Sequence, residues 1–215
     1  MIILPGTKVI NSSNTIDSFG SIGGSVLHKG VTYLMTCFHC VYEQKMNWTS
    51  IIQDVNTSVS FLADARPVIG GEIKFTIRNS SVDIALLQLK PGFETQNIIP
   101  EIGQITGFEF LEKDDRYKVW VSKYGAKTEY TEGVFLGIFP QLGAPYPPKK
   151  KIHHLSNLLM FESKGSKPFA DKGDSGSWII NSEKKLVGVV VMVKDGITFA
   201  ISMNSIVNNI SFSIK

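Results

Sequence analysis

Gly173-Asp174-Ser175-Gly176-Ser177 is the most informative stretch of the sequence, and the apolar run Trp178-Ile179-Ile180 follows it. A serine hydroxyl is a weak nucleophile, so a catalytic serine needs a base beside it and backbone N–H groups that face the developing oxyanion. Glycines on both sides of Ser175 permit the tight turn that this geometry requires, and the N–H groups of Gly173 and Ser175 are candidates for an oxyanion hole. The alternative is an ordinary turn between strands, in which these residue types are common.

A histidine at the end of an apolar strand is the second feature. Residues 34–38 lead into His39, and a short helix is predicted directly after it, over residues 41–46. A rigid mount of this kind suits a general base. His153 and His154, in contrast, fall in a predicted exposed loop, and a lone histidine is more often structural than catalytic.

An aspartate at the start of a continuous apolar run is the third feature. Asp83 precedes Ile84-Ala85-Leu86-Leu87, so its carboxylate is expected to be partly buried and to need hydrogen-bond donors. A histidine ring N–H would satisfy it and would fix the tautomer of the ring. The alternative is a turn aspartate that opens a strand.

The rest of the chain reads as short strands separated by turn residues, which predicts an all-β protein. Two short helices are expected, over residues 41–46 and 204–210, the second capped by Ser202 or Asn204. Gln141 to Lys151 is predicted to be an exposed loop. The predicted strands cover residues 21–28, 32–36, 59–62, 73–77, 84–89, 118–122, 133–139, 177–180, 186–193 and 198–201.

Composition excludes several classes of function. The chain has 215 residues, 43% of them hydrophobic, which is enough for a sizeable core, and its formal charge of +3 is too small to indicate a nucleic-acid partner. Lys149 to Lys151 are expected in a solvated loop. No stretch approaches the length of a membrane span, and the N-terminus lacks the features of a signal peptide. A cytoplasmic protein without a membrane partner is therefore expected.

Only two cysteines are present, Cys37 and Cys40, on either side of His39. Zinc would need further ligands that the spacing does not supply, and a thioredoxin-like pair would need a βαβ setting. We expect both to be reduced, mostly buried thiols, in keeping with a reducing compartment, and we expect neither a metal nor a cofactor.

The order His39, Asp83, Ser175 and the motifs around these residues resemble the chymotrypsin/trypsin-like serine peptidase superfamily, in a non-secreted bacterial-type form. The resemblance covers the chain from about Phe19 to Ile206. It implies two antiparallel six-stranded β-barrels with a short C-terminal helix: residues 1–105 with His39 and Asp83, and residues 106–215 with Ser175. It also implies acyl transfer, in which Ser175 attacks, His39 moves the proton and Asp83 orients His39.

The same resemblance places the primary specificity pocket. Phe169 occupies the position at which an acidic residue would give a preference for basic substrate side chains, so a preference for apolar side chains is expected. Asp171 would attract a basic side chain if its loop folded differently. The backbone of residues 191–193 is expected to pair with substrate as an added strand. The residues implied in substrate binding are Phe169, Ala170, Asp171, Val191, Met192 and Val193.

Two departures from the family bear on regulation. In secreted members, the cysteine that follows the histidine forms a disulfide with a cysteine on the preceding strand. Ile22 occupies the position of that second cysteine here, so Cys40 is left unpaired. Secreted zymogens also create a new N-terminus that pairs with the aspartate before the nucleophile. No such activation site is evident ahead of Phe19, so Asp174 needs another partner, for which Lys172 is a local candidate. Activity is expected to be either constitutive or switched on by an activating partner.

The expected function is that of a serine endopeptidase that cleaves a protein substrate, by analogy a cytosolic regulatory or antiviral defence protease acting on an effector protein encoded nearby. A catalytically silent double barrel used for binding, a pseudopeptidase, is one alternative; fluorophosphonate labelling of Ser175 discriminates it. A viral polyprotein-processing peptidase of the same fold is another, and it would show a cleaved N-terminus.

Overall fold

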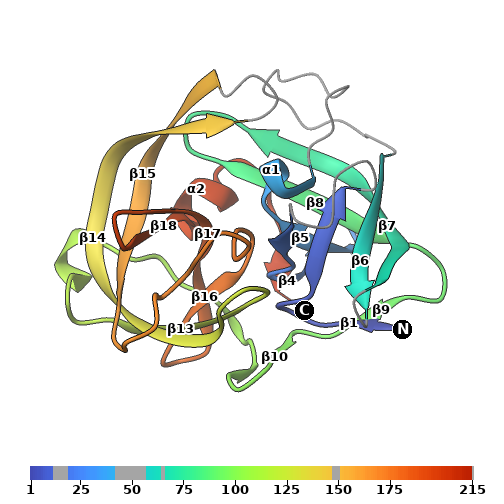
Figure 1. Cartoon of the computed structure of the whole chain (residues 1–215), viewed down its shortest axis with the longest axis horizontal. Coiled ribbons are helices and arrows are strands. Elements are labelled where there is room, and N and C mark those ends of the chain that lie inside the picture. Colours follow the sequence, from blue (N-terminus) through green and yellow to red (C-terminus); the bar gives the residue numbers. More distant parts are fainter. Residues whose placement is uncertain (12–18, 42–56, 64–65, 147–150, 215) are drawn as a thin grey trace.

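The computed structural model describes residues 1–11, 19–41, 57–63, 66–146 and 151–214. Two curled sheets lie side by side, one built largely from the first half of the chain and one from the second (Figure 1). Strands separated by tight turns dominate, as the density of β-branched and aromatic residues predicts. The predicted all-β class and chymotrypsin-like double barrel are confirmed.

The first sheet has eight strands in the order β19-β4-β5-β8-β7-β6-β2-β3, and all its described pairings are antiparallel. Its strands are β2 (Lys8–Asn11), β3 (Gly20–Ser21), β4 (Gly24–His28), β5 (Val31–Thr36), β6 (Thr57–Ala63), β7 (Arg66–Arg78), β8 (Asp83–Leu89) and β19 (Ser213–Ile214).

The second sheet has seven strands in the order β12-β17-β16-β13-β14-β15-β18, and β17 also pairs with β18, which curls the sheet on itself. Its strands are β12 (Gly107–Phe108), β13 (Trp120–Gly125), β14 (Glu129–Tyr146), β15 (Lys151–Ser163), β16 (Trp178–Asn181), β17 (Lys185–Lys194) and β18 (Ile197–Ser202).

The remaining elements are short. Two-residue strands form the pairs β1 (Ile2–Ile3) with β9 (Glu94–Thr95) and β10 (Ile98–Ile99) with β11 (Gly103–Gln104). The helices are α1 (Phe38–Val41), the 3-10 turn η1 (Lys113–Asp115) and α2 (Met203–Val207). Ser202 caps α2, because its hydroxyl accepts a hydrogen bond from the N–H of Ser205 at 3.1 Å. The helix expected over 41–46 falls, except for Val41, outside the described residues.

The C-terminal strand returns to the first sheet. β19 pairs with β4, so the last residues of the chain stabilise the barrel that the first half builds. The second sheet begins at β12, and the division of the chain between residues 105 and 106 remains a prediction.

One expected loop is wrong. β14 continues to Tyr146 and β15 begins at Lys151, so most of the Gln141 to Lys151 segment is strand rather than loop. The pairing runs through Gly143 opposite His154 and Pro145 opposite Ile152. Glycine and proline suggested a break, but a ladder of tertiary pairings overrides these local preferences.

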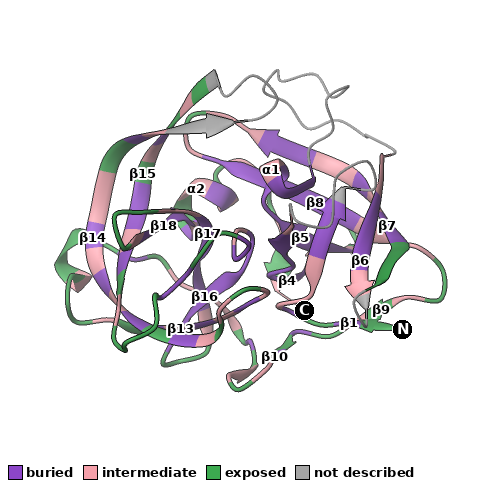
Figure 2. Cartoon of the chain, viewed as in Figure 1, coloured by how far each residue is buried: buried purple, intermediate pink, exposed green. Residues whose placement is uncertain are grey.

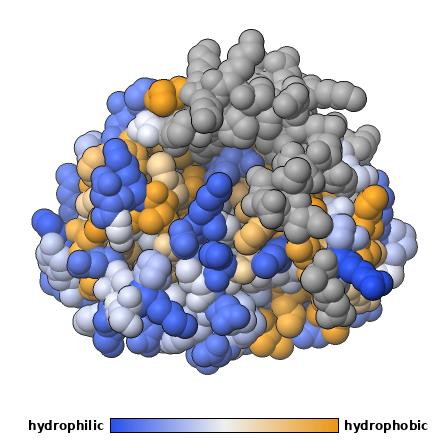
Figure 3. Space-filling model, viewed as in Figure 1, coloured by the Kyte–Doolittle hydropathy of each residue, from blue (hydrophilic) through white to orange (hydrophobic). Residues whose placement is uncertain are grey.

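Buried apolar side chains connect the two barrels. The larger cluster of buried apolar side chains draws on both sheets, whereas a smaller cluster lies within the second, between Leu111 and Ala200. Figure 2 shows the buried residues concentrated on the strands of both sheets. Figure 3 shows the described part of the same face as a mosaic of hydrophilic and small apolar areas. Within the described ranges, no helix has the length and apolar character needed to cross a membrane.

Candidate active site

His39 and Asp83 are brought together by a helix and a strand of the first barrel. α1 carries His39 immediately after β5, and Asp83 is the first residue of β8. The Nδ1 atom of His39 lies 2.6 Å from Oδ2 of Asp83, and the His39 backbone N–H donates to Oδ1 at 3.2 Å. The Asp83 side chain is fully buried, whereas 23% of the His39 side chain is exposed. One end of the imidazole is therefore fixed, and the ring still reaches solvent.

The surroundings of His39 favour its protonated form. Burial by itself lowers the pKa of the imidazole, but the electrostatic interactions and hydrogen bonds with Cys40 and Asp83 outweigh burial, so the pKa is raised well above its usual value. A buried carboxylate that accepts from Nδ1 leaves Nε2 as the proton-accepting nitrogen. This is the arrangement of a general base.

Ser175 lies in a tight turn between Gly173 and Gly176, both of which have a positive φ. Gly173 has a φ of +113°, and the N–H of Asp174 donates to the carbonyl of Asp171 at 2.9 Å. A positive φ of this size is open to glycine at little cost. Among the described residues, the backbone N–H groups of Gly173 and Ser175 have no hydrogen-bond partner. Both donors of the expected oxyanion hole are thus unoccupied by other parts of the described chain.

The backbone of Ser175 docks onto the first barrel next to His39. Its carbonyl accepts a hydrogen bond from the N–H of Ser21 at 2.8 Å and from the thiol of Cys40 at 3.5 Å. Gly20 makes this approach possible, because a Cβ atom there would lie 2.2 Å from the Cys40 sulfur and 3.0 Å from the Ser175 carbonyl oxygen. The Ser175 hydroxyl itself donates to the carbonyl of Val191 at 3.2 Å.

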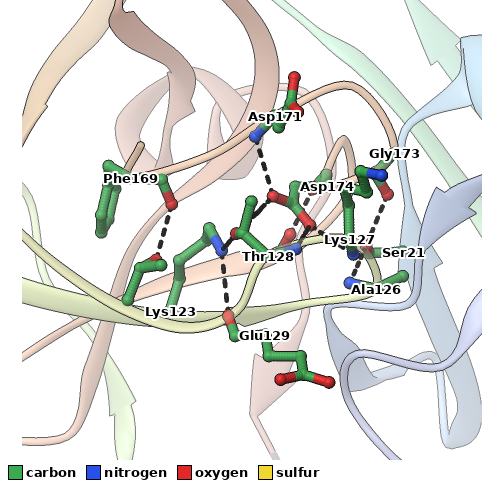
Figure 4. Close-up of polar contacts among 12 residues, drawn as sticks. Ser21, Lys123, Ala126, Lys127, Thr128, Glu129, Phe169, Asp171, Gly173 and Asp174 are labelled. Carbon is green, nitrogen blue, oxygen red and sulfur yellow. Dashed lines mark hydrogen bonds and ion pairs between the residues drawn. The ribbon is translucent and has the colours of Figure 1, made fainter. Parts of the chain in front are cut away.

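Asp174, the residue before the serine, is buried in a cage of donors (Figure 4). Its Oδ1 accepts from the backbone N–H of Lys127 at 2.8 Å and of Thr128 at 3.2 Å. Its Oδ2 accepts from the Thr128 hydroxyl at 2.7 Å and from the Asp171 N–H at 2.9 Å. The Lys123 ammonium group lies 3.5 Å from the same oxygen. A buried carboxylate needs this degree of compensation.

The charged partner of Asp174 is therefore Lys123, and the suggestion of Lys172 is wrong, because Lys172 is exposed. Lys123 is fully buried and also donates to the Thr128 hydroxyl at 2.6 Å and the Glu129 carbonyl at 3.2 Å. Burial lowers the pKa of Lys123, and the Asp174 charge opposes that shift.

Sequence reasoning missed Lys123, although a signal was available. β13 alternates, with Val121, Lys123 and Gly125 on its buried face. A lysine at an inward-facing strand position implies a buried acid. Gly125 provides the room for that acid, because a Cβ at this position would lie 2.3 Å from Oδ1 of Asp174.

The residues expected to bind substrate divide into three groups. Phe169 and Ala170 have no exposed surface and belong to the smaller apolar cluster. Val191 is buried, and Met192 and Val193 are half-buried in β17. Asp171 is exposed, and its side chain accepts a hydrogen bond from the N–H of Lys172.

The two thiols are buried, as expected, and the structure holds them unbonded to each other. Cys37 donates to the carbonyl of Val190 at 3.2 Å. Its sulfur, a His39 nitrogen and an Asp83 oxygen lie within 4.8 Å of one another, which is close enough for three metal ligands. Burial raises the pKa of the Cys37 thiol well above its usual value.

Comparisons with known proteins agree with this fold. The family model described as Trypsin matches residues 8–210. Nocardiopsis protease (NAPase) superimposes with a TM-score of 0.69 at 18% identity, over 99% of this chain and 98% of that chain. Thermobifida fusca protease A gives 0.64 at 18% identity, over 97% and 95%, and Cellulomonas bogoriensis chymotrypsin gives 0.63 at 15% identity, over 97% and 95%. No protein with a curated description is similar enough in sequence to count as a match.

A double β-barrel, a buried aspartate on a histidine and a serine in a Gly-Asp-Ser-Gly turn define the class of trypsin-like serine proteases. The chain belongs to the trypsin family and is a serine endopeptidase.

Proposed function

We propose that this endopeptidase works through His39, Asp83 and Ser175 and cleaves protein substrates by way of an acyl-enzyme. The observation that carries the proposal is the 2.6 Å contact between Nδ1 of His39 and Asp83, because it fixes the imidazole in the tautomer that a base requires. Ser175 forms the ester with the substrate acyl group while His39 takes its proton. His39 then gives that proton to the leaving amine, and water hydrolyses the ester with His39 again as base.

The hydroxyl of Ser175 has to rotate before it reacts. In this conformation it donates to the Val191 carbonyl. Rotation about one side-chain bond redirects a serine hydroxyl, and catalytic hydrogen bonds often tighten only when substrate is present. The unpartnered N–H groups of Gly173 and Ser175 then stabilise the oxyanion that forms on the attacked carbonyl.

We further propose that the activity is constitutive. In the zymogens that this chain resembles, a new N-terminus supplies the cation for the aspartate before the nucleophile. Here Lys123 supplies it from within the second barrel, and Thr128, Lys127 and Asp171 complete the set of donors. A turn held in this way does not need a cleavage event to become ordered. An extension on the N-terminus should therefore leave turnover unchanged.

The setting inside the cell, an effector encoded nearby as substrate and a role in antiviral defence remain predictions from the sequence. Buried thiols at Cys37 and Cys40, without a bridge between them, support the proposed reducing compartment.

The test is turnover of the isolated chain on an unstructured protein such as reduced casein, followed by gel electrophoresis and mass spectrometry. We expect cleavage by the wild-type chain and none by Ser175→Ala. A folded wild-type chain without cleavage would favour the silent binding module, and equal cleavage by Ser175→Ala would show that another residue is the nucleophile.

A further inference from the structure

The free edge of β17 lies beside Ser175. The Ser175 hydroxyl contacts the carbonyl of Val191, which places this part of β17 next to the nucleophile. β17 pairs with β16 as far as Val189, and the backbone of Val190 is hydrogen-bonded to Gly176 and Ser177. From Val191 to Lys194, its strand partner among the described residues is β18 alone. A peptide that adds to this edge passes the nucleophile. We call the substrate residue whose carbonyl is attacked the acyl-side residue. The side chains around Val193 then determine which acyl-side residues bind.

The side chains of β17 and β18 border the space that would receive the acyl-side side chain. Val193 is the cross-strand partner of Thr198, so both side chains lie on one face of the sheet. Ala200, two residues further along β18, lies on the same face and belongs to the smaller apolar cluster. Val193 packs against that cluster as well. Thr198 and Val193 therefore face the compartment that contains Phe169 and Ala170.

The depth of this compartment is already filled by the protein. Phe169 has no exposed surface, and its ring lies 5.8 Å from that of Phe161, centroid to centroid. Its carbonyl accepts a hydrogen bond from the Thr131 hydroxyl at 2.6 Å, which fixes the segment in place. An aromatic or long side chain from a substrate would have to displace a packed ring, and overpacking of this kind is costly.

The compartment also lacks a charged group at its base. Asp171 is exposed, and Figure 4 shows its carboxylate pointing away from Phe169. Asp174 is already compensated by Lys123 and four further donor contacts. Neither carboxylate is placed to receive a basic side chain, so the alternative of a basic preference through Asp171 loses its support.

One polar atom in this wall has no partner. Thr198 is 1% exposed, and its Oγ1 makes no hydrogen bond within the described part of the chain. A buried hydroxyl without a partner is unfavourable, and such groups in native proteins usually meet a ligand or water. This hydroxyl lies at the wall shared by Val193 and the smaller cluster.

We propose that Val193 and Thr198 narrow the specificity pocket, so that the peptidase cleaves after small uncharged residues: alanine, valine and threonine. The proposal rests on the peptidase function proposed above and names its substrate class. Val193 and Thr198 are cross-strand partners that face this compartment, and the fully buried Phe169 already occupies part of it. A short acyl-side side chain therefore fits the compartment better than a long one.

The test uses chromogenic peptides that are identical except for the acyl-side residue, which is alanine, valine, threonine, phenylalanine or lysine. We expect kcat/KM for the three small residues to exceed that for phenylalanine and lysine by on the order of 100-fold, since size discrimination in such pockets reaches that scale. The double variant Val193→Gly with Thr198→Gly should raise the phenylalanine-to-alanine ratio by on the order of 10- to 100-fold. The matched control is Ile197→Ala, because Ile197 packs against the other, larger cluster and should leave the ratio unchanged.

Thermal unfolding and reaction with a fluorophosphonate that carries no acyl-side side chain report whether each variant is folded and reactive. A wild-type chain that reacts with the fluorophosphonate but prefers phenylalanine or lysine would contradict the proposed specificity pocket. It would not contradict the proposed peptidase function. An unchanged ratio in a folded, reactive double variant would also contradict the proposed specificity pocket. A folded wild-type chain that neither reacts nor cleaves would overturn the function and, with it, the pocket.

Discussion

The ammonium group of Lys123 lies 3.5 Å from the carboxylate of Asp174, and neither side chain is exposed to solvent. This pair links β13 to the turn that carries the nucleophile, so the position of Ser175 depends on a strand more than forty residues before it. Removing one member of a buried pair leaves an uncompensated charge, which costs more than the pair itself contributes.

Lys123→Met should therefore destabilise the protein by about 3–5 kcal/mol, as expected for a broken buried ion pair. Because the turn loses its anchor, labelling of Ser175 should slow as well. Denaturant unfolding and fluorophosphonate labelling measure the two effects. Lys172→Met, on the same turn but exposed, is the control and should change neither. Equal stability of the two variants would show that Lys123 does not hold Asp174.

The Thr128 hydroxyl connects the same two charges, because it accepts from Lys123 at 2.6 Å and donates to Asp174 at 2.7 Å. Thr128→Val should cost about 1–3 kcal/mol of unfolding free energy, since two buried polar groups lose a partner. Thr128→Ser keeps the hydroxyl and should recover most of the loss. If serine were as destabilising as valine, packing of the methyl group would be the cause instead.

Gly125 leaves the space that Asp174 occupies, because a Cβ at residue 125 would lie 2.3 Å from Oδ1. Gly125→Ala should displace the carboxylate and lower both the stability and the rate of Ser175 labelling; overpacking typically costs about 1–3 kcal/mol. Gly165→Ala is a suitable control, because a Cβ there meets nothing within 4 Å. Wild-type behaviour of both alanine variants would contradict the tight contact.

Asp83→Asn should reduce kcat/KM by about 10⁴-fold while the fold is retained, because an amide in place of the carboxylate favours the wrong tautomer of His39. Burst and steady-state kinetics on the small-residue peptides measure the loss. A loss below tenfold would show that Asp83 does not orient the base.

The pH dependence follows from the raised pKa of His39. Burial lowers this pKa, but Cys40 and Asp83 raise it by more, so the protonated, inactive imidazole persists above pH 6.5. The midpoint of the acid limb of kcat/KM should lie above pH 6.5, and activity should rise as pH increases through it. Removing the carboxylate charge in Asp83→Asn should move that midpoint to lower pH. A wild-type midpoint below 6.5 would contradict the proposed role of Asp83.

The sequence predicted the elements that local patterns determine. Asp83 opens an apolar strand and His39 follows the end of one, and these local features are sufficient to place each at the end of a barrel strand. Gly173 and Gly176 both adopt a positive φ, as a tight turn around Ser175 requires. Such features depend on residues close together in the chain.

Features that depend on tertiary pairing were not predicted. β15 carries Asn157 at a positive φ and two adjacent histidines, so its sequence lacks a strand pattern, yet it pairs with β14 along its length. The Lys123 and Asp174 pair joins residues that no local pattern connects. β19 likewise joins a sheet whose other strands all lie in the first half of the chain.

The most direct test of the account is covalent labelling of the native chain with a fluorophosphonate, followed by peptide mass spectrometry. The account predicts a single adduct on the Ser175 hydroxyl, absent in Ser175→Ala and strongly slowed in His39→Ala. A folded chain that remains unlabelled, or that carries its adduct on a different residue, would contradict it.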